Sequence, residues 1–234
     1  MLRLFIAQIA DEIIIEDKQF HYISNVMKKK TDEEILVFDG ISGEYIYKIK
    51  SILKKTAVLE KVKKIKDFEK SLDVWLLFAP LKKEATDFVI EKATELGVKK
   101  FVPIITKRVN NHNFNIKRAH LQAIEASEQC ERLDVPEILE PQNLSEVLKK
   151  WDSSRALCPL LERTDAKTIN EVFSQLKTDK VAIVVGPEGG FDDKEKELLK
   201  QYQPISMGKR ILRAETASIS ALACYQAIKG DFNS

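Results

Sequence analysis

The chain has 234 residues, enough for one large domain or two small ones, and its hydrophobic content of 44% is sufficient for a buried core. No apolar run approaches the roughly 18 residues that a membrane-spanning helix needs, and the N-terminus lacks the pattern of a signal peptide. Three widely separated cysteines form neither a metal-binding spacing nor a disulfide framework. We therefore expect a cytoplasmic protein with no bound metal and no membrane partner.

The net charge of only +2 means that nucleic-acid binding has to be argued from local clusters. One cluster is Lys28–Lys30. A second runs from Lys48 to Lys66 and contains eight lysines opposed by Glu60 alone. Such clusters either contact RNA or form a solvated face that protects sheet edges, and the solvated face is the more common case.

Residues 1–70 form a small β-rich unit in this interpretation. Asp39-Gly40 and Ser42-Gly43 are turn signals between two strands, and a helix over 17–29 begins with Asp17 as its N-cap. Five strands and one helix are typical of a small barrel. The charged stretch 63–71 is expected to be a linker. The predicted strands are Arg3–Ile6, Glu12–Ile15, Glu34–Phe38, Glu44–Ile49 and Ala57–Val62.

From Leu72 onward, strands alternate with helices, which indicates an α/β domain with a mainly parallel sheet. In the helix over 84–96, Phe88, Val89, Lys92 and Leu96 share one side, and Gly97 follows at the C′ position. Capping-box pairs are expected at Asn143/Glu146, Thr168/Glu171 and Asp192/Glu195. The other predicted helices cover 115–132 and 215–228, and the other predicted strands cover 74–78, 101–105, 180–185 and 204–207. Residues 156–161 are an apolar segment interrupted by Pro159.

Two glycine-containing runs each follow an apolar strand, Gly186–Phe191 (GPEGGF) and Gly208–Ala217 (GKRILRAETA). Loops at the carboxyl ends of strands are where open α/β sheets bind ligands. The first run is not followed by the Gly-Lys-Ser/Thr of a nucleotide-binding P-loop, so a nucleotide hydrolase is disfavoured. Read alone, the first run is equally compatible with an ordinary turn, and Thr216 or Ser218 of the second with a helix cap.

Together these runs resemble the C-terminal signature of the bacterial 16S ribosomal RNA uridine-N3 methyltransferases, which belong to the SPOUT class. The resemblance extends over nearly the whole chain. It includes Lys92–Val98 (KATELGV), Arg118 with Glu125–Arg132 (EASEQCER) and Pro136, and Arg3, Phe5, His21 and Val26 near the N-terminus. Lys28 stands where the family usually has arginine, which retains the charge and loses the planar fork.

The resemblance implies a PUA-like β-barrel RNA-binding domain over 1–70. It also implies a SPOUT methyltransferase domain over 71–234, an α/β domain with a parallel sheet and a C-terminal trefoil knot. In that fold the two glycine loops and segment 156–162 become neighbours. The implied activity is transfer of a methyl group from S-adenosyl-L-methionine to N3 of a uridine in 16S ribosomal RNA of the small ribosomal subunit, by a homodimer.

The site residues expected from the resemblance fall into three groups. Arg213 is the first catalytic candidate, because a guanidinium stabilises a uracil anion. Glu215 is the second, as the group that orients Arg213 or as a base, and it is equally well explained as a first-turn acid on a helix dipole. Glu188 is expected to anchor its loop. Cofactor contacts are expected from Leu160, Leu161, Gly186, Glu188, Gly190, Met207, Gly208, Ile211, Leu212, Thr216 and Ala217, and RNA phosphate contacts from Arg3, Lys28, Lys29, Lys30, Arg108 and Arg132.

Two alternatives remain open at this point. The first is a methyltransferase of the same fold acting on another RNA position. The second is a non-catalytic RNA-binding or ribosome-assembly factor that uses the barrel and the lysine clusters. The second alternative leaves the two glycine loops unexplained.

Overall fold

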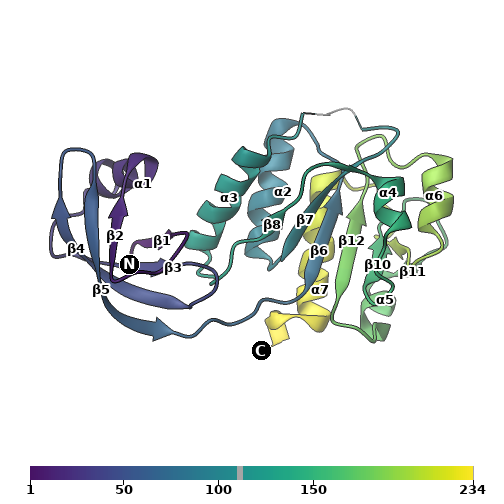
Figure 1. Ribbon diagram of the computed structural model, residues 1–234. Helices are drawn as coiled ribbons and strands as arrows, with labels where there is room; N and C mark the ends of the chain where they lie inside the picture. The colour runs from purple at the N-terminus through teal and green to yellow at the C-terminus, as the bar shows by residue number, and fades with distance from the viewer. Residues whose placement is uncertain (110–112, 234) are drawn as a thin grey trace. The chain divides into compact units, whose positions relative to one another are not determined.

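The computed structural model describes residues 1–109 and 113–233 (Figure 1). Their contacts divide the chain into two compact units. Unit 1 contains Met1–Lys70 and also Ser127–Val135, whereas unit 2 contains Ser71–Ala126 and the chain from Pro136 onward. The sequence-based division had placed residues 127–135 in the second domain. The chain therefore returns to unit 1 after its first long excursion through unit 2.

Unit 1 is built on a five-stranded sheet with the strand order β1-β3-β4-β5-β2. Its pairs are antiparallel except for β1 with β3. The predicted positions of the strands are confirmed, but β5 pairs with β4 as far as Lys66, so the predicted linker over 63–71 starts too early. The strands are β1 (Arg3–Phe5), β2 (Glu12–Ile15), β3 (Glu34–Phe38), β4 (Glu44–Ile52) and β5 (Ala57–Lys66).

The helical segment of unit 1 differs from its prediction at both ends. Helix α1 (Asp17–His21) continues as one π-helical turn over Tyr22–Val26. Glu16 is the N-cap, and Asp17 lies inside the helix with a positive φ of 49°, so the predicted capping by Asp17 is wrong. Local propensity does not distinguish an α-helical from a π-helical turn, so this change could not be predicted from the residues.

Arg3 is a structural residue at the centre of unit 1. Its Nε donates to the Glu44 carboxylate, and its Nη1 donates to the carbonyls of Ser127 and Arg132, both at 2.9 Å. The guanidinium also lies 4.2 Å from the centre of the Phe38 ring. Arg3 is only 5% exposed, which argues against the phosphate contact predicted for it. These bonds hold residues 127–135 on the sheet of unit 1.

Unit 2 contains a six-stranded sheet whose strand pairs are all parallel, as predicted. The order is β10-β12-β6-β7-β8, with β9 pairing with β7. Pro159 is tolerated because β10 is an edge strand. The strands are β6 (Val74–Phe78), β7 (Lys100–Ile105), β8 (Glu137–Ile138), β9 (Gln142–Asn143), β10 (Ala156–Pro159) and β12 (Val181–Val185).

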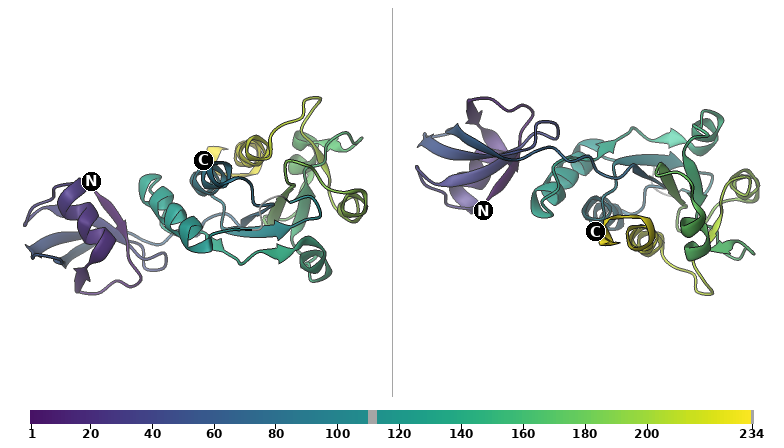
Figure 2. Two further views of the ribbon diagram at one scale, coloured as in Figure 1. Left: turned by 90° about the horizontal axis from the view of Figure 1, so that it is seen from above. Right: turned by 90° about the horizontal axis from the view of Figure 1, so that it is seen from below.

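Helices cover both faces of this sheet. Leu144 of α4 and Leu199 of α6 share a buried core with the strands on one face. Helices α2 and α7 lie side by side on the other (Figure 2). The helices of unit 2 are α2 (Lys83–Glu95), α3 (Ile116–Gln129), α4 (Leu144–Lys149), α5 (Ile169–Gln175), α6 (Asp193–Leu199) and α7 (Ala214–Lys229), followed by a 3-10 turn at Asp231–Asn233.

The local helix signals were partly correct. Capping boxes form at Thr168/Glu171 and Asp192/Glu195, whereas the Asn143 side chain makes no capping bond. Gly97 ends α2 with a φ of 79°, as expected of a C′ glycine. The side shared by Phe88, Val89, Lys92 and Leu96 is not the buried side as a whole: Phe88 is 44% exposed, and α2 buries Val89, Ile90, Ala93 and Thr94.

The strand predicted over 204–207 is β13 (Ile205–Ser206), and it lies outside the main sheet. It pairs in parallel with β11 (Lys167–Thr168) to form a separate two-stranded sheet. An isolated bridge also joins Leu160 to Ile205. The second glycine run therefore reaches β10 through its own short strand.

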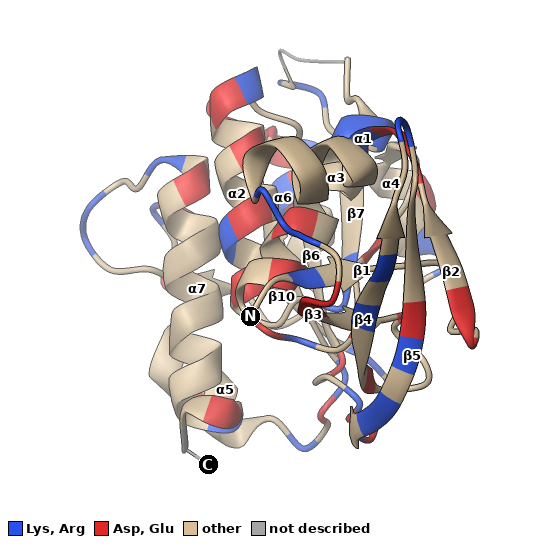
Figure 3. Ribbon diagram, turned by 90° about the vertical axis from the view of Figure 1, so that its left-hand side faces the viewer, with Lys and Arg blue, Asp and Glu red and all other residues tan. Residues whose placement is uncertain are grey.

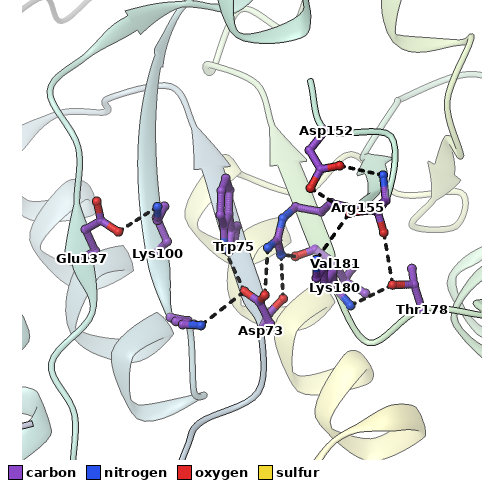
Figure 4. Close-up of polar contacts among 11 residues, drawn as sticks. Asp73, Trp75, Lys100, Glu137, Asp152, Arg155, Thr178, Lys180 and Val181 are labelled. Carbon is purple, nitrogen blue, oxygen red and sulfur yellow. Dashed lines mark hydrogen bonds and ion pairs between the residues drawn. The ribbon is translucent and has the colours of Figure 1, made fainter. Parts of the chain in front are cut away.

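A cation–aromatic cluster closes the amino-terminal end of the main sheet (Figure 4). The Trp75 ring centre lies 3.8 Å from the Arg155 guanidinium and 4.3 Å from the Lys100 ammonium. Asp73 accepts a bond of 2.9 Å from Arg155 Nη2. Partial burial opposes ionisation of Asp73, but the bond from Arg155 prevails and lowers the pKa of the carboxyl below its usual value. This cluster fixes the starts of β6, β10 and β12.

We predict that Glu44→Ala destabilises unit 1 by about 3–5 kcal/mol, because it leaves the buried Arg3 guanidinium without its counter-charge. Hydrogen exchange of the amides in β1, β3 and β4 measures this change. The matched control is Glu12→Ala, which removes one partner of the exposed Lys50 ion pair and should cost less than about 1 kcal/mol. Equal effects of the two substitutions would contradict the structural role of Arg3.

Candidate functional site

A pocket of about 860 Å³ opens in unit 2 where three loops meet. The loops follow β10, β12 and β13. Its size lies in the range of small-molecule binding sites. The lining residues are Arg108, Leu160–Asp165, Val185–Phe191, Lys196, Ser206–Ala214 and Ala217.

The topology explains why these loops converge. Strands β10 and β12 are parallel neighbours, so the loops after Pro159 and Val185 leave the same edge of the sheet. The third loop is brought to that edge by the Leu160–Ile205 bridge and by a bond of 3.1 Å from Leu161 N to Ile205 O. Segments that are about 45 residues apart in the chain therefore form one wall.

The GPEGGF loop owes its shape to its glycines. A Cβ on Gly186 would lie 3.0 Å from the Phe191 ring, so glycine lets this buried ring pack against the end of β12. Gly190 has a φ of 66° and donates to the Pro187 carbonyl at 2.8 Å, which closes a tight turn. A Cβ on Gly190 would meet no atom within 4 Å, so this part of the loop faces open space.

The GKRILRAETA run begins with a second left-handed glycine, Gly208, with a φ of 91° and open space at its Cβ position. The run ends in Arg213, which is exposed and is the N-cap residue of α7. Neither Thr216 nor Ser218 caps this helix, because Arg213 occupies the N-cap position and Ser218 Oγ donates to the Ala214 carbonyl at 2.8 Å. Arg213 therefore stands at the rim of the pocket on a rigid helix start.

Most of the residues predicted to contact a cofactor line this pocket. The exception is Thr216, which lies one position before Ala217 on α7 and is not part of the lining. Of the two catalytic candidates, Arg213 lines the pocket and Glu215 does not. Glu215 lies in the first turn of α7, where an acid interacts favourably with the helix dipole.

Residues 163–165 belong to the pocket wall but were not predicted. Arg163 has a positive φ of 53°, which is uncommon for a residue with a side chain. Thr164 Oγ1 is buried and has no hydrogen-bond partner within the described parts of the chain. The only sequence signal was a run of polar residues that begins at Glu162, after the apolar segment 156–161.

The predicted RNA contacts are scattered, and several of their side chains have protein partners. Arg132 pairs with Asp134 at 3.0 Å, and Lys29 pairs with Glu33 at 2.6 Å. Arg108 lies at the pocket and donates to the carbonyl of Gly189 at 3.1 Å. Lys28 and Lys30 are exposed and form no ion pair within the described residues.

Figure 3 shows the lysines of β4 and β5 in blue, and most of them pair with acids. Lys48 pairs with Asp32 at 2.7 Å, Lys61 with Asp11 at 2.5 Å and Lys64 with Asp67 at 2.6 Å. Of the two alternatives for this cluster, a solvated face and an RNA contact, the ion pairs favour the solvated face. In the sequence this cluster looks more positively charged than it is, because acids outside it, such as Asp11 and Asp32, pair with its lysines.

Within residues 1–109 and 113–233, no three His, Cys, Asp or Glu side chains are arranged to hold a metal ion. In the same ranges, no helix has the length and apolar character needed to cross a membrane.

Comparison with known proteins identifies the family. Residues 68–226 match the RNA methyltransferase domain family, and residues 15–62 match the RNA methyltransferase PUA domain. The chain is 33% identical to ribosomal RNA small subunit methyltransferase E of Rickettsia conorii over 90% of its own length and 87% of that protein. It is 32% identical to the protein of the same name from Synechocystis, over 94% of this chain and 76% of the relative.

Solved structures agree with this result. The chain superposes with a TM-score of 0.88 and 27% identity on ribosomal RNA small subunit methyltransferase E from Neisseria gonorrhoeae bound to S-adenosyl methionine, covering 99% of both chains. A methyltransferase from Legionella pneumophila in complex with the same cofactor gives 0.87 and 27%, covering 97% of both. This chain therefore belongs to the ribosomal RNA small subunit methyltransferase E family.

Proposed function

We propose that this protein uses S-adenosyl-L-methionine to methylate N3 of a uridine in the 16S ribosomal RNA of the small ribosomal subunit. The observation that carries the proposal is the three-loop pocket, in a chain whose relatives are named for small-subunit ribosomal RNA methylation and whose structural neighbours hold this cofactor. The N3 position follows from the sequence resemblance, and the cytoplasmic location is proposed from the cysteine pattern.

The residues of the pocket fit the proposed cofactor. Leu160 and Leu212 offer apolar surface for an adenine ring, and the open space at Gly190 and Gly208 allows the backbone to approach a ligand closely. The buried Thr164 hydroxyl has hydrogen-bonding capacity that the described protein atoms do not use. A cavity of about 860 Å³ is large enough for a nucleoside that carries an amino acid.

The cofactor, when bound, supplies a methyl group on a sulfonium centre. The protein has to hold a uridine whose N3 carries a proton and takes part in base pairing, so the base has to be unpaired or extruded. Arg213 is placed at the pocket rim to stabilise the negative charge that develops on the uracil as N3 loses its proton. Glu215 is outside the lining and is assigned to the helix dipole instead.

The proposed division of labour assigns RNA holding to the PUA-like domain over 1–70 and methyl transfer to the domain over 71–234. Lys28 and Lys30 are the cations of the first domain that we assign to RNA phosphates, because they are exposed and form no ion pair in the part of the chain that is described. Such contacts position the RNA and do not read its sequence.

Two further features of the proposal follow from the resemblance. The chain threads its three pocket loops into a trefoil knot, and it forms a homodimer that completes the site. The dimer is supported by α7, which carries no charged residue between Glu215 and Lys229 and is almost free of charge along its length (Figure 3). A particle of 26.7 kDa by light scattering would contradict the dimer.

The modified nucleoside tests the proposed reaction directly. Small ribosomal subunits from cells lacking this enzyme are incubated with the protein and a methyl-labelled cofactor, and the nucleosides are then separated by mass spectrometry. We expect the label in 3-methyluridine alone. Label in another nucleoside would contradict the N3 assignment and leave the methyltransferase assignment intact.

We predict that Arg213→Ala lowers kcat by about 10²–10³-fold, the loss typical of removing one charge-stabilising donor from a transition state. The affinity for S-adenosyl-L-methionine, measured by calorimetry, should change little. The control is Lys194→Ala, which removes an exposed cation from α6 outside the pocket lining. Unchanged methyl transfer in Arg213→Ala would exclude the proposed role.

A further inference from the structure

We propose that Arg108 is a positioning residue that holds the GPEGGF loop in the shape of the pocket wall. This role replaces the RNA phosphate contact that the sequence predicted for it. The inference rests on the proposed function of the pocket as a cofactor site. Its basis is a set of contacts between the turn at Thr106–Val109, directly after β7, and the loop after β12.

Arg108 bonds to the loop on both sides of Gly190. Its Nη1 donates to the carbonyl of Gly189 at 3.1 Å and to that of Phe191 at 3.4 Å. Gly190, with its φ of 66°, turns the chain between these two acceptors. One guanidinium nitrogen therefore ties together the two peptide groups that flank the open side of the loop.

The stem of Arg108 is also packed against the loop. A Cβ on Gly189 would lie 3.4 Å from Arg108 Cβ and 3.7 Å from Arg108 Cδ, so the absence of a side chain at Gly189 allows this close approach. The contact thus has an apolar part and a hydrogen-bonded part. A lysine would keep an apolar stem and a charge, but its ammonium lacks the rigid planar geometry that aims the Arg108 donor at these carbonyls.

The turn that carries Arg108 is itself fixed. Lys107 N donates to Glu195 Oε1 at 2.7 Å, while Glu195 Oε2 accepts from Asp192 N at 2.9 Å in the capping box of α6. Val109 is buried in the same core cluster as Phe191. Arg108 therefore reaches the loop from a rigid base, as a positioning residue must.

The test compares Arg108→Ala and Arg108→Lys with Lys107→Ala. The last variant removes the neighbouring exposed cation and retains the backbone N–H that bonds to Glu195. Calorimetry measures the affinity for S-adenosyl-L-methionine and for 5′-methylthioadenosine, which lacks the amino-acid carboxylate. The KM for ribosomal RNA and its dependence on salt are measured in parallel, and hydrogen exchange follows the amides of residues 187–191.

We expect Arg108→Ala to weaken both ligands about tenfold, in line with the loss of a hydrogen bond from a charged donor. Exchange in the loop should accelerate, and the KM for RNA and its salt dependence should stay unchanged. Arg108→Lys should restore part of the affinity, and Lys107→Ala should resemble the wild type in every measurement. Because Arg108 is exposed, we expect all three variants to fold, and Arg108→Lys carries the test if the alanine variant does not.

Three results would overturn the inference. A raised KM for RNA with a weaker salt dependence and unchanged ligand affinity would show a phosphate contact instead. Weaker binding of S-adenosyl-L-methionine alone would show a direct contact with its carboxylate. Unchanged loop exchange in Arg108→Ala would exclude positioning altogether. If the wild type binds neither ligand, the proposed function fails, and the loop exchange still decides the role of Arg108.

Discussion

The pocket depends on one backbone contact, the bridge between Leu160 and Ile205 at the end of β10. Parallel pairing of β10 with β12 brings two loops together without it, because the loops leave the same edge of the sheet. The third loop, which carries Gly208 and Arg213, has no strand in the main sheet and reaches the pocket through this bridge and β13. The bridge holds the start of this loop, and the packing of α7 against α2, α5 and β12 holds its end, where Arg213 is the N-cap.

The glycine loops also acquire their shape through contacts with other residues. Glycine permits the left-handed turns at Gly190 and Gly208, but it does not select them, since glycine populates many conformations. Selection comes from contacts made by other segments, namely the Phe191 ring over Gly186 and the Arg108 guanidinium on the carbonyls around Gly190. A loop preorganised in this way loses less entropy when it binds a ligand.

Three arginines that the sequence predicted to contact RNA instead form bonds within the protein. Arg3, Arg108 and Arg132 each resembled an RNA contact, and each bonds to a carbonyl or a carboxylate of the protein. The planar guanidinium suits such bonds, because it presents several donors in fixed directions. Among the cations predicted to contact RNA, Lys28 and Lys30 are exposed and form no ion pair within the described residues, so we propose that they contact the RNA backbone.

What the sequence predicted correctly is mainly local. The capping boxes at Thr168 and Asp192 and the helix end at Gly97 depend on residues within one turn, so they can be read directly. Two local predictions failed, the caps at Asp17 and Asn143, and the other incorrect predictions involve distant partners. The buried ion pair of Arg3 with Glu44 spans 41 positions, and residues 163–165 join the pocket only through strand order. The prediction that the two glycine loops and segment 156–162 are neighbours came from the family resemblance. Residue spacing and periodicity alone do not predict it.

We propose that the three loops form one binding site for S-adenosyl-L-methionine. Hydrogen exchange of the whole chain with and without this cofactor tests it most directly. We predict slower exchange in residues 160–165, 186–191 and 206–213 together, and no change in β1–β5 of unit 1. Protection of a single loop, or protection confined to residues outside the pocket, would contradict the claim.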